Sequence, residues 1–317
     1  MKVCVIKTSS MGDVIHTLPA LTDAQKAIPS LSIDWVVEEN FAEIPRWHSA
    51  VNRVIPIALR RWRKSPFSIQ TRNEWKNYRT LLQAKNYDAV IDAQGLFKSA
   101  FFATRLANGI KHGYDRKSIR EPIASFFYDK KYAISYQQHA VERIRQLFAQ
   151  ALSYSLPEGK GDYGIARHFI SADSIEPYVI FFHSTTRDEK HWSEHEWRNL
   201  IEKLTALSIQ VRLPWGNEKE KTRAERLAVG LSHVVVLPRL SLHELAEQIA
   251  NAKAVVSVDT GLAHLTAALD KPNITLYGAT DPKLIGCYGK NQHYLSASSM
   301  ENIKSDQVFS MLNLLIK

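Results

Sequence analysis

Short apolar runs of strand length alternate with longer amphipathic segments along the whole chain. Most of the short runs are rich in Val and Ile and continuously apolar, which is typical of parallel strands buried on both faces. The expected strands are residues 3–6, 33–37, 53–57, 88–93, 178–183, 209–213, 233–237, 254–259 and 273–278. Helical spacing of apolar positions is clearest in 195–207, 221–231 and 242–252. The alternation predicts an α/β protein whose parallel sheets are covered by helices on both sides.

This alternation is interrupted by residues 154–177, which are rich in Gly, Pro and small polar residues. A chain of 317 residues, 45% of them hydrophobic, is long enough for two domains with separate cores. We therefore expect two doubly wound domains that join near residue 170. Because open parallel sheets bind ligands beyond the carboxyl ends of their strands, functional residues are expected in the loops that follow strands, facing a cleft between the domains.

The excess of positive over negative charge lies entirely in the first half of the chain. Of the formal net charge of +9, residues 1–150 contribute 23 Lys and Arg against 13 Asp and Glu, and the remainder 18 against 19. Residues 60–79 hold seven basic residues and one acid, interleaved with aromatic residues, and 111–122 add four more basic residues. The asymmetry predicts an anionic partner, which could be nucleic acid, an anionic lipid surface or a phosphorylated substrate. A merely solvated basic face is the alternative.

Cysteine content and hydropathy narrow the class of protein further. Cys4 and Cys287 are too few for a disulfide framework and lack the spacing of metal ligands, so a reducing, cytoplasmic setting is expected. No run approaches the ~18 apolar residues of a membrane span, and the first run is shorter than the ~7 to 15 of a signal-peptide core. We expect a protein that is soluble or lies on a surface.

The strongest local signal follows the apolar run at 254–258. Asp259, Thr260 and Gly261 lie where a helix should begin, so unpaired backbone N–H groups and the positive end of the helix dipole could hold a diphosphate. His264, about one turn further on, could face the same ligand. Simple capping of the helix by Asp259 or Thr260 is the alternative.

A second signal is the loop HSTTRDEKHW at 183–192, which follows the first strand of the second half. Thr185, Thr186 and Lys190 are groups suited to neutralising a phosphate that gains charge as it leaves. A lysine in a loop is more commonly just solvated.

A third signal follows the expected strand at 209–213. Glu218 and Glu220 open a helix there, where the helix dipole favours acids in any case. An acid at a strand end beside a nucleotide pocket can also bind ribose hydroxyls.

The loop after the first strand, TSSMGD at 8–13, carries one glycine, Gly12, and a carboxylate, Asp13. A nicotinamide dehydrogenase should show G-x-G-x-x-G at this junction, which the loop does not fit. Asp13 either caps the helix that follows or acts as a general base at the strand end. Because the candidate phosphate-binding residues lie in the second half, we expect this loop to face the other substrate.

Five segments, taken in order, resemble the bacterial ADP-heptose:lipopolysaccharide heptosyltransferases: residues 7–21, 60–64, 92–100, 257–268 and 277–282. The resemblance spans nearly the whole chain and is nearest the type I branch, which adds the first heptose to Kdo-lipid A; the type II branch, which extends a heptosylated core, is the alternative. It implies a GT-B fold with Rossmann-like domains at 1–170 for the acceptor and 171–300 for the ADP-sugar, and a helix in 301–317 that packs back on the first domain. One departure is Ala279, where members often have proline before Thr280.

The resemblance also implies an inverting transfer that needs no metal and no cofactor. It places the catalytic base at Asp13 and gives Lys190 to the leaving diphosphate. The implied donor contacts are Thr185, Thr186, Lys190, Glu220 for the ribose, Asp259, Thr260, Gly261 and His264; the implied acceptor contacts are Ser10, Arg60, Arg61, Arg63 and Arg120. The expected partners are ADP-heptose, Kdo-lipid A and an anionic membrane surface, with peripheral attachment to the cytoplasmic face of the inner membrane and no nucleic acid.

The resulting hypothesis is direct displacement of ADP from the anomeric carbon by a Kdo hydroxyl whose proton passes to Asp13. Arginines would recognise the Kdo carboxylates and the lipid A phosphates, while Trp62 and Trp75 either meet acyl chains or belong to the core. Two other classes stay open. A nucleic-acid binder would leave the nucleotide site of the second half without a use, and an epimerase of the same architecture would process a UDP-sugar without an acceptor.

Overall fold

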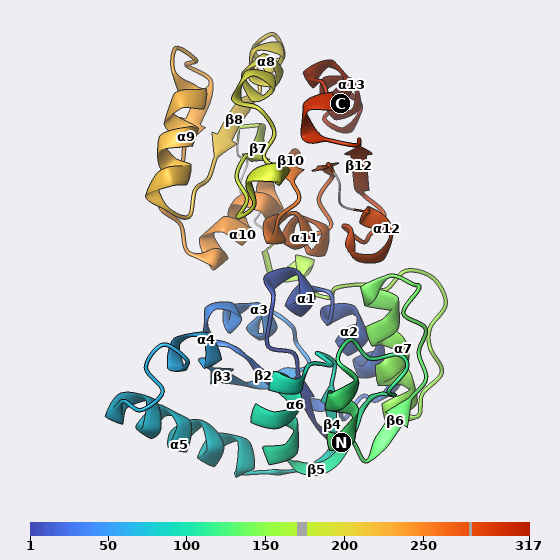
Figure 1. Cartoon of the computed structure of the whole chain (residues 1–317). Coiled ribbons are helices and arrows are strands. Elements are labelled where there is room, and N and C mark those ends of the chain that lie inside the picture. Colours follow the sequence, from blue (N-terminus) through green and yellow to red (C-terminus); the bar gives the residue numbers. More distant parts are fainter. Residues whose placement is uncertain (170–175, 279–280) are drawn as a thin grey trace. The chain divides into compact units, whose positions relative to one another are not determined.

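The computed structural model describes residues 1–169, 176–278 and 281–317, which form two compact units, Met1–Gly164 and Ile165–Lys317 (Figure 1). Each unit is built around a six-stranded parallel sheet. The expected domain boundary at residue 170 lies outside the described residues, as do Ala279 and Thr280.

The sheet of the first unit has the strand order β3-β2-β1-β4-β5-β6, with neighbouring strands parallel. Its strands are β1 (Lys2–Ile6), β2 (Ser32–Glu38), β3 (Val51–Ile57), β4 (Asn86–Asp92), β5 (Asn108–Tyr114) and β6 (Lys130–Tyr132). Its helices are α1 (Met11–Ile15), α2 (Leu18–Ala27), α3 (Glu43–Arg46), α4 (Leu59–Trp62), α5 (Ile69–Gln83), α6 (Phe97–Phe102) and α7 (Ala140–Leu152), with a 3-10 helix η3 (Pro122–Phe127). Right-handed crossovers put α2 on one face of this sheet, where it contacts α7, and α5 and α6 on the other.

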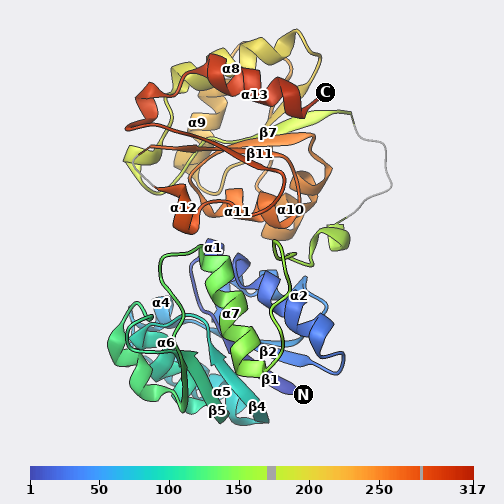
Figure 2. The same cartoon turned by 90° about the vertical axis from the view of Figure 1, so that its right-hand side faces the viewer.

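The sheet of the second unit repeats this winding in the order β12-β11-β10-β7-β8-β9. Its strands are β7 (Tyr178–Phe182), β8 (Gln210–Leu213), β9 (Val234–Val236), β10 (Ala254–Val258), β11 (Asn273–Tyr277) and β12 (Gln292–Ser296). Its helices are α8 (Glu194–Thr205), α9 (Glu218–Ala228), α10 (Leu242–Asn251), α11 (Gly261–Ala268), α12 (Pro282–Ile285) and α13 (Ser305–Leu315). Figure 2 shows α8 and α13 on one side of this sheet and α10 and α11 on the other.

The nine strands expected from the apolar runs are all present, and their ends fall within two residues of the expected ones. The three expected helices are present as α8, α9 and α10. Three further strands, β5, β6 and β12, have no apolar run to reveal them. β5 is interrupted by glycines, one of which, Gly109, has φ +142° and lies where a Cβ would come within 2.4 Å of the Tyr87 carbonyl oxygen. β6 and β12 are sheet edges with partly exposed, polar residues.

Both sheets therefore have the doubly wound order that the sequence predicts, with a reversal of strand order beside the first strand of each unit. The reversal lies between β1 and β4 in the first sheet and between β7 and β10 in the second. Helices leave these strand pairs toward opposite faces, so the loops at their carboxyl ends are the ones open to a ligand. Among the described residues, no helix combines the length and apolarity that a membrane crossing requires.

The last helix, α13, belongs to the second unit. Val308 and Leu312 are fully buried in the core of that unit, and the Trp192 indole N–H donates to the Ile303 carbonyl at 2.8 Å just before the helix. Lys203 on α8 forms an ion pair with Asp306 at 2.8 Å. Within this unit α13 contacts α8 and the second sheet, and the expected packing of the helix on the first domain stays a prediction.

Replacing Leu312 by Ala should therefore lower the free energy of unfolding of the second unit by about 2 to 5 kcal/mol, through lost burial and the cavity left behind. Leu314 lies on the same helix with 75% of its surface exposed, and its replacement by Ala is the matched control, with an expected change within about 0.5 kcal/mol. Urea unfolding followed by tryptophan fluorescence measures both. Equal effects of the two substitutions would show that the helix is not held by its buried side.

Candidate active site

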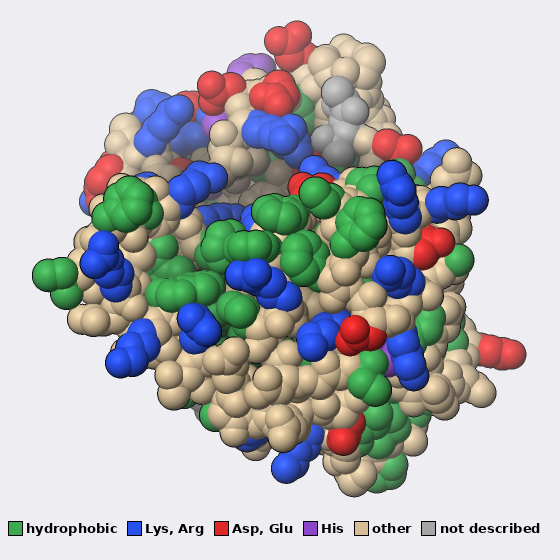
Figure 3. All heavy atoms as spheres, turned by 60° about the horizontal axis from the view of Figure 1, so that its bottom comes forward, with side chains coloured by type: hydrophobic (Ala, Val, Ile, Leu, Met, Phe, Trp, Pro, Cys, Tyr) green, Lys and Arg blue, Asp and Glu red, His purple; other side chains and the backbone are tan. Residues whose placement is uncertain are grey.

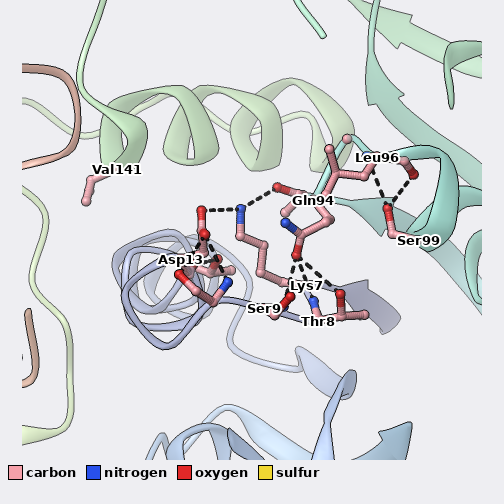
Figure 4. A network of polar contacts seen from close by, with 12 residues as sticks. Lys7, Thr8, Ser9, Asp13, Gln94, Leu96, Ser99 and Val141 are labelled. Atoms are coloured by element: carbon pink, nitrogen blue, oxygen red, sulfur yellow. Dashed lines mark hydrogen bonds and ion pairs between the residues drawn. The ribbon is translucent and has the colours of Figure 1, made fainter. Parts of the chain in front are cut away.

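Asp13 lies in the first turn of α1, directly beyond the carboxyl end of β1 (Figure 4). Its carboxylate accepts hydrogen bonds from the Ser10 backbone N–H at 2.9 Å and the Ser10 hydroxyl at 3.0 Å. The Lys7 ammonium is 3.4 Å from the other carboxylate oxygen and donates to the Ala93 carbonyl at 2.9 Å. The Lys7 side chain is 6% exposed and that of Asp13 43%, so the carboxylate is the member of the pair presented to a ligand.

These neighbours set the protonation state of Asp13. Burial would raise the pKa of its carboxyl, but the Lys7 ammonium and the two Ser10 hydrogen bonds outweigh burial and hold the pKa below its ordinary value. Asp13 is therefore a carboxylate at neutral pH and can accept a proton. The two predicted roles of Asp13, helix cap and general base, are compatible. The carboxylate accepts hydrogen bonds from Ser10, the residue before α1, and part of its surface stays exposed at the strand end.

Gln94, which sequence reasoning missed, holds the loop in which Asp13 is anchored. Its side-chain oxygen accepts from the backbone N–H groups of Thr8 at 3.0 Å and Ser9 at 3.1 Å. Its own backbone N–H donates at 2.9 Å to Asp92, the last residue of β4. The loop after β1 is thus tied to the loop after β4, across the point where the strand order reverses.

Asp92 supports this arrangement from the interior. It is fully buried and accepts hydrogen bonds from the hydroxyls of Ser99 and Thr104. Burial raises the pKa of this carboxyl despite the hydrogen bonds it accepts. Lys7, Asp92 and Gln94 could have been found by sequence, because each lies at the end of an apolar run that is expected to be a central strand.

In the second unit, the loops after β7 and β10 bring together three of the predicted donor residues. The Lys190 ammonium forms an ion pair with the Asp259 carboxylate at 2.5 Å, with 21% and 16% of the two side chains exposed. The Thr185 hydroxyl donates to the Asp259 carbonyl at 3.2 Å, and its backbone N–H donates to His191 Nε2 at 3.1 Å. Asp259 therefore holds the Lys190 side chain in place, and Thr186 is exposed in the same loop.

The helix α11 begins at Gly261 with Thr260 as N-cap, but no side-chain hydrogen bond caps its first turn. The capping alternative for Asp259 is therefore not realised, because its carboxylate is directed to Lys190. The positive end of this helix therefore lies next to the ion pair of Asp259 and Lys190. His264 in the following turn is 9% exposed, with the Cys287 sulfur 4.0 Å from its Nδ1.

Glu220 lies in the first turn of α9, after β8. Its carboxylate oxygens accept from the Gly216 backbone N–H and the Asn217 side-chain amide, both at 2.7 Å. Asn217 is the N-cap of α9 and accepts in return from the Glu220 N–H at 3.1 Å. Glu220 thus fixes the loop after β8 at the strand end, where the sequence places it.

The basic segment that begins at α4 divides into paired and exposed side chains. Arg61 binds two carboxylates, Glu39 and Glu74, each at 2.9 Å. The Arg60 guanidinium lies 5.6 Å from the centre of the Phe41 ring, and Arg63 is exposed, as is Arg120 on a separate loop. Arg61 therefore holds α4 in place, and the other three arginines remain the candidates for binding an anion.

Trp62 belongs to the core, and Trp75 is partly buried and packs against it. Trp62 is 7% exposed, and its indole N–H donates to Glu74 at 2.6 Å. Trp75 packs edge-on against it, with ring centroids 5.8 Å apart. Among the described residues, no group of three or more His, Cys, Asp or Glu side chains has an arrangement that could hold a metal ion.

Comparison with known proteins connects these features to a family. The family model of glycosyltransferase family 9 (heptosyltransferase) matches residues 75–313. The chain is 58% identical to lipopolysaccharide heptosyltransferase 1 of Escherichia coli K12, over 99% of both chains. It is also similar to two solved structures of E. coli heptosyltransferase WaaC. The structure with ADP has a TM-score of 0.97 and 57% identity, covering 99% of this chain and all of the other. The structure with ADP-2-deoxy-2-fluoro heptose has a TM-score of 0.94 and 56% identity, covering 99% of each.

The shared architecture is the GT-B fold expected from the resemblance, with one doubly wound sheet in each unit. The match extends over both units, so the loops after β1, β4, β7 and β10 all lie within it. The chain belongs to glycosyltransferase family 9, the heptosyltransferases.

Proposed function

We propose that this heptosyltransferase moves L-glycero-D-manno-heptose from ADP-heptose to the first Kdo of Kdo-lipid A, with Asp13 as general base. The observation that carries the proposal is the end-to-end similarity to proteins named lipopolysaccharide heptosyltransferase 1. The arrangement of charges in the two units supports the division of the reaction into a donor half and an acceptor half.

In the donor half, the diphosphate of ADP-heptose binds between Lys190 and the N-terminus of α11. Asp259 already holds the Lys190 ammonium, whose remaining N–H groups can donate to a phosphate oxygen without breaking that ion pair. The Thr185 hydroxyl donates a further hydrogen bond to the diphosphate, and the Glu220 carboxylate accepts hydrogen bonds from the ribose hydroxyls. As the bond between the anomeric carbon and the diphosphate breaks, the charge that develops on the leaving oxygen is stabilised by the ammonium and the helix dipole.

In the acceptor half, a Kdo hydroxyl attacks the anomeric carbon and its proton passes to Asp13. The carboxylate has a lowered pKa and is a weak base toward a free hydroxyl, but the hydroxyl becomes acidic as its new bond to carbon forms. Attack from the side opposite to the leaving diphosphate inverts the anomeric centre. Ser10 is occupied as the donor to Asp13, so it orients the base in addition to any acceptor contact.

The exposed guanidinium groups recognise the anionic acceptor. Arg60, Arg63 and Arg120 bind Kdo carboxylates and lipid A phosphates through paired N–H donors. Arg61 contributes indirectly, because its two carboxylate partners keep α4 in position. Since the acceptor is a membrane lipid, the protein works peripherally at the cytoplasmic face of the inner membrane. The proposed transfer uses neither a metal ion nor a cofactor.

Incubation with ADP-heptose and Kdo-lipid A, followed by mass spectrometry of the lipid, tests the reaction. The lipid should gain one heptose, and Asp13→Asn should reduce transfer by about 10²-fold or more. Asp306→Asn, at a carboxylate 80% exposed on α13, is the control with unchanged transfer. Transfer by Asp13→Asn at a rate near that of wild type would reject the assignment of Asp13 as the general base. Salt-dependent RNA binding without use of ADP-heptose, or turnover of a UDP-sugar without acceptor, would reject the reaction itself.

Lys7→Met should shift the acidic limb of the pH profile of kcat/KM to higher pH. The limb reports protonation of the base, and removing the ammonium removes a cause that lowers the pKa of Asp13, so that pKa rises. Methionine keeps the length of the buried stem. Lys2→Met, at the exposed beginning of β1, is the matched control. An acidic limb unmoved in Lys7→Met would mean that Asp13 is not the titrating base.

A further inference from the structure

The face of the first unit that carries α5 and α6 exposes large apolar side chains among basic ones (Figure 3). Phe67 is 83% exposed and Ile69 77%, at the beginning of α5. Phe97 at the start of α6 is 39% exposed, and Ile123 and Phe126 on η3 are 55% and 71% exposed. Single exposed apolar residues are ordinary on a protein surface, but a contiguous apolar patch marks an interaction site.

Aromatic contacts join the elements of this face into one platform. Phe101 on α6 contacts Phe97, with ring centroids 5.4 Å apart, and Phe127 on η3 at 6.2 Å. Phe102 contacts Phe101 at 5.0 Å and Trp75 on α5 at 5.9 Å. The exposed apolar side chains of α6 and η3 therefore stand on a packed aromatic layer that continues under α5, rather than on independent loops.

Basic residues surround the apolar ones. Arg63 and Lys64 precede Phe67, and Lys98 follows Phe97, all of them exposed. The Arg105 guanidinium lies 3.6 Å from the centre of the Phe101 ring.

The neighbouring acids are already engaged by other groups. Glu74 binds Arg61 and Trp62, and Glu121 accepts from the Phe97 backbone N–H at 2.7 Å. The face is therefore apolar and positively charged together.

We propose that this face docks on an anionic lipid bilayer, with Phe67 and Phe126 inserted at the level of the headgroups. Exposed Phe and Ile side chains ringed by Lys and Arg match a lipid interface, where the rings meet acyl chains and the cations meet phosphates. Protein interfaces, by contrast, are depleted in Lys at their centres. The assignment rests on the proposed function in one respect, that the acceptor is anchored in a membrane.

Flotation of the whole chain with phosphatidylcholine vesicles, with and without phosphatidylglycerol, tests the assignment. Wild-type protein should bind vesicles that contain phosphatidylglycerol, and less so as salt is raised. Phe67→Ser with Phe126→Ser should weaken binding about tenfold or more through loss of apolar burial. Lys64→Gln with Lys98→Gln should weaken it about fivefold or more at low salt, because each cation near the surface adds attraction.

The matched control is Val229→Ser with Leu314→Ser, which removes two apolar side chains of the second unit that are 66% and 75% exposed. This variant should bind vesicles like wild type. Equal loss in the control, undiminished binding of the Phe67 and Phe126 variant, or failure of wild type to bind any vesicle would each overturn the assignment. If wild-type protein binds no vesicles and the Phe67 and Phe126 variant changes oligomeric state, the face is instead an interface with a second copy of the chain.

A transfer assay separates this assignment from the proposed function. With an acceptor that keeps the Kdo and phosphates but lacks acyl chains, the Phe67 and Phe126 variant should transfer heptose at the wild-type rate. With acceptor embedded in anionic vesicles, its rate should fall along with its binding. Absence of transfer to both acceptors by wild-type protein would reject the proposed reaction and leave the vesicle result standing.

Discussion

The right-handed winding of parallel strands is the constraint on which both halves of this protein depend. A sheet that starts at its centre must carry its next connections to one face and its later ones to the other, so the chain diverges at the first strand. In each unit this divergence leaves two loops uncovered at the carboxyl ends of neighbouring strands: those after β1 and β4, and those after β7 and β10. Asp13 and Gln94 follow β1 and β4, and Lys190 and Asp259 follow β7 and β10.

The same kind of ion pair is used for opposite purposes at the two positions. In the first unit the lysine is almost fully buried and the aspartate is presented, so the loop offers a carboxylate with a lowered pKa. In the second unit the two partners are about equally buried, and the helix dipole of α11 adds positive potential beside the Lys190 ammonium. Burial of Lys7 therefore decides which charge a substrate meets in the first unit, whereas in the second unit the helix dipole favours an anion. An acceptor proton and a leaving diphosphate require these two opposite charges.

Apolar patterning was sufficient to predict the central strands, because strands buried on both faces must be continuously apolar. It failed for β5, β6 and β12, where glycine or an exposed edge removes that requirement. For the candidate site, residue type and place indicated the Lys190 loop, the α11 turn and Asp13, whose roles stay predictions, but they did not indicate which charges pair. In the sequence Arg61 cannot be distinguished from Arg60 and Arg63. In the structure, however, its guanidinium forms ion pairs with Glu39 and Glu74, which come from other elements. Such pairings, like the contact of α13 with α8, depend on tertiary structure and leave no local signal.

The central claim is that the base and the leaving-group stabiliser are separate devices in separate units. Calorimetric titration of ADP into Asp13→Asn and Lys190→Met tests it most directly. Asp13→Asn should bind ADP with the wild-type Kd, whereas Lys190→Met should bind about 10- to 100-fold more weakly, since a charged hydrogen bond to a phosphate is lost. Weakened binding of ADP by Asp13→Asn together with wild-type binding by Lys190→Met would contradict the account.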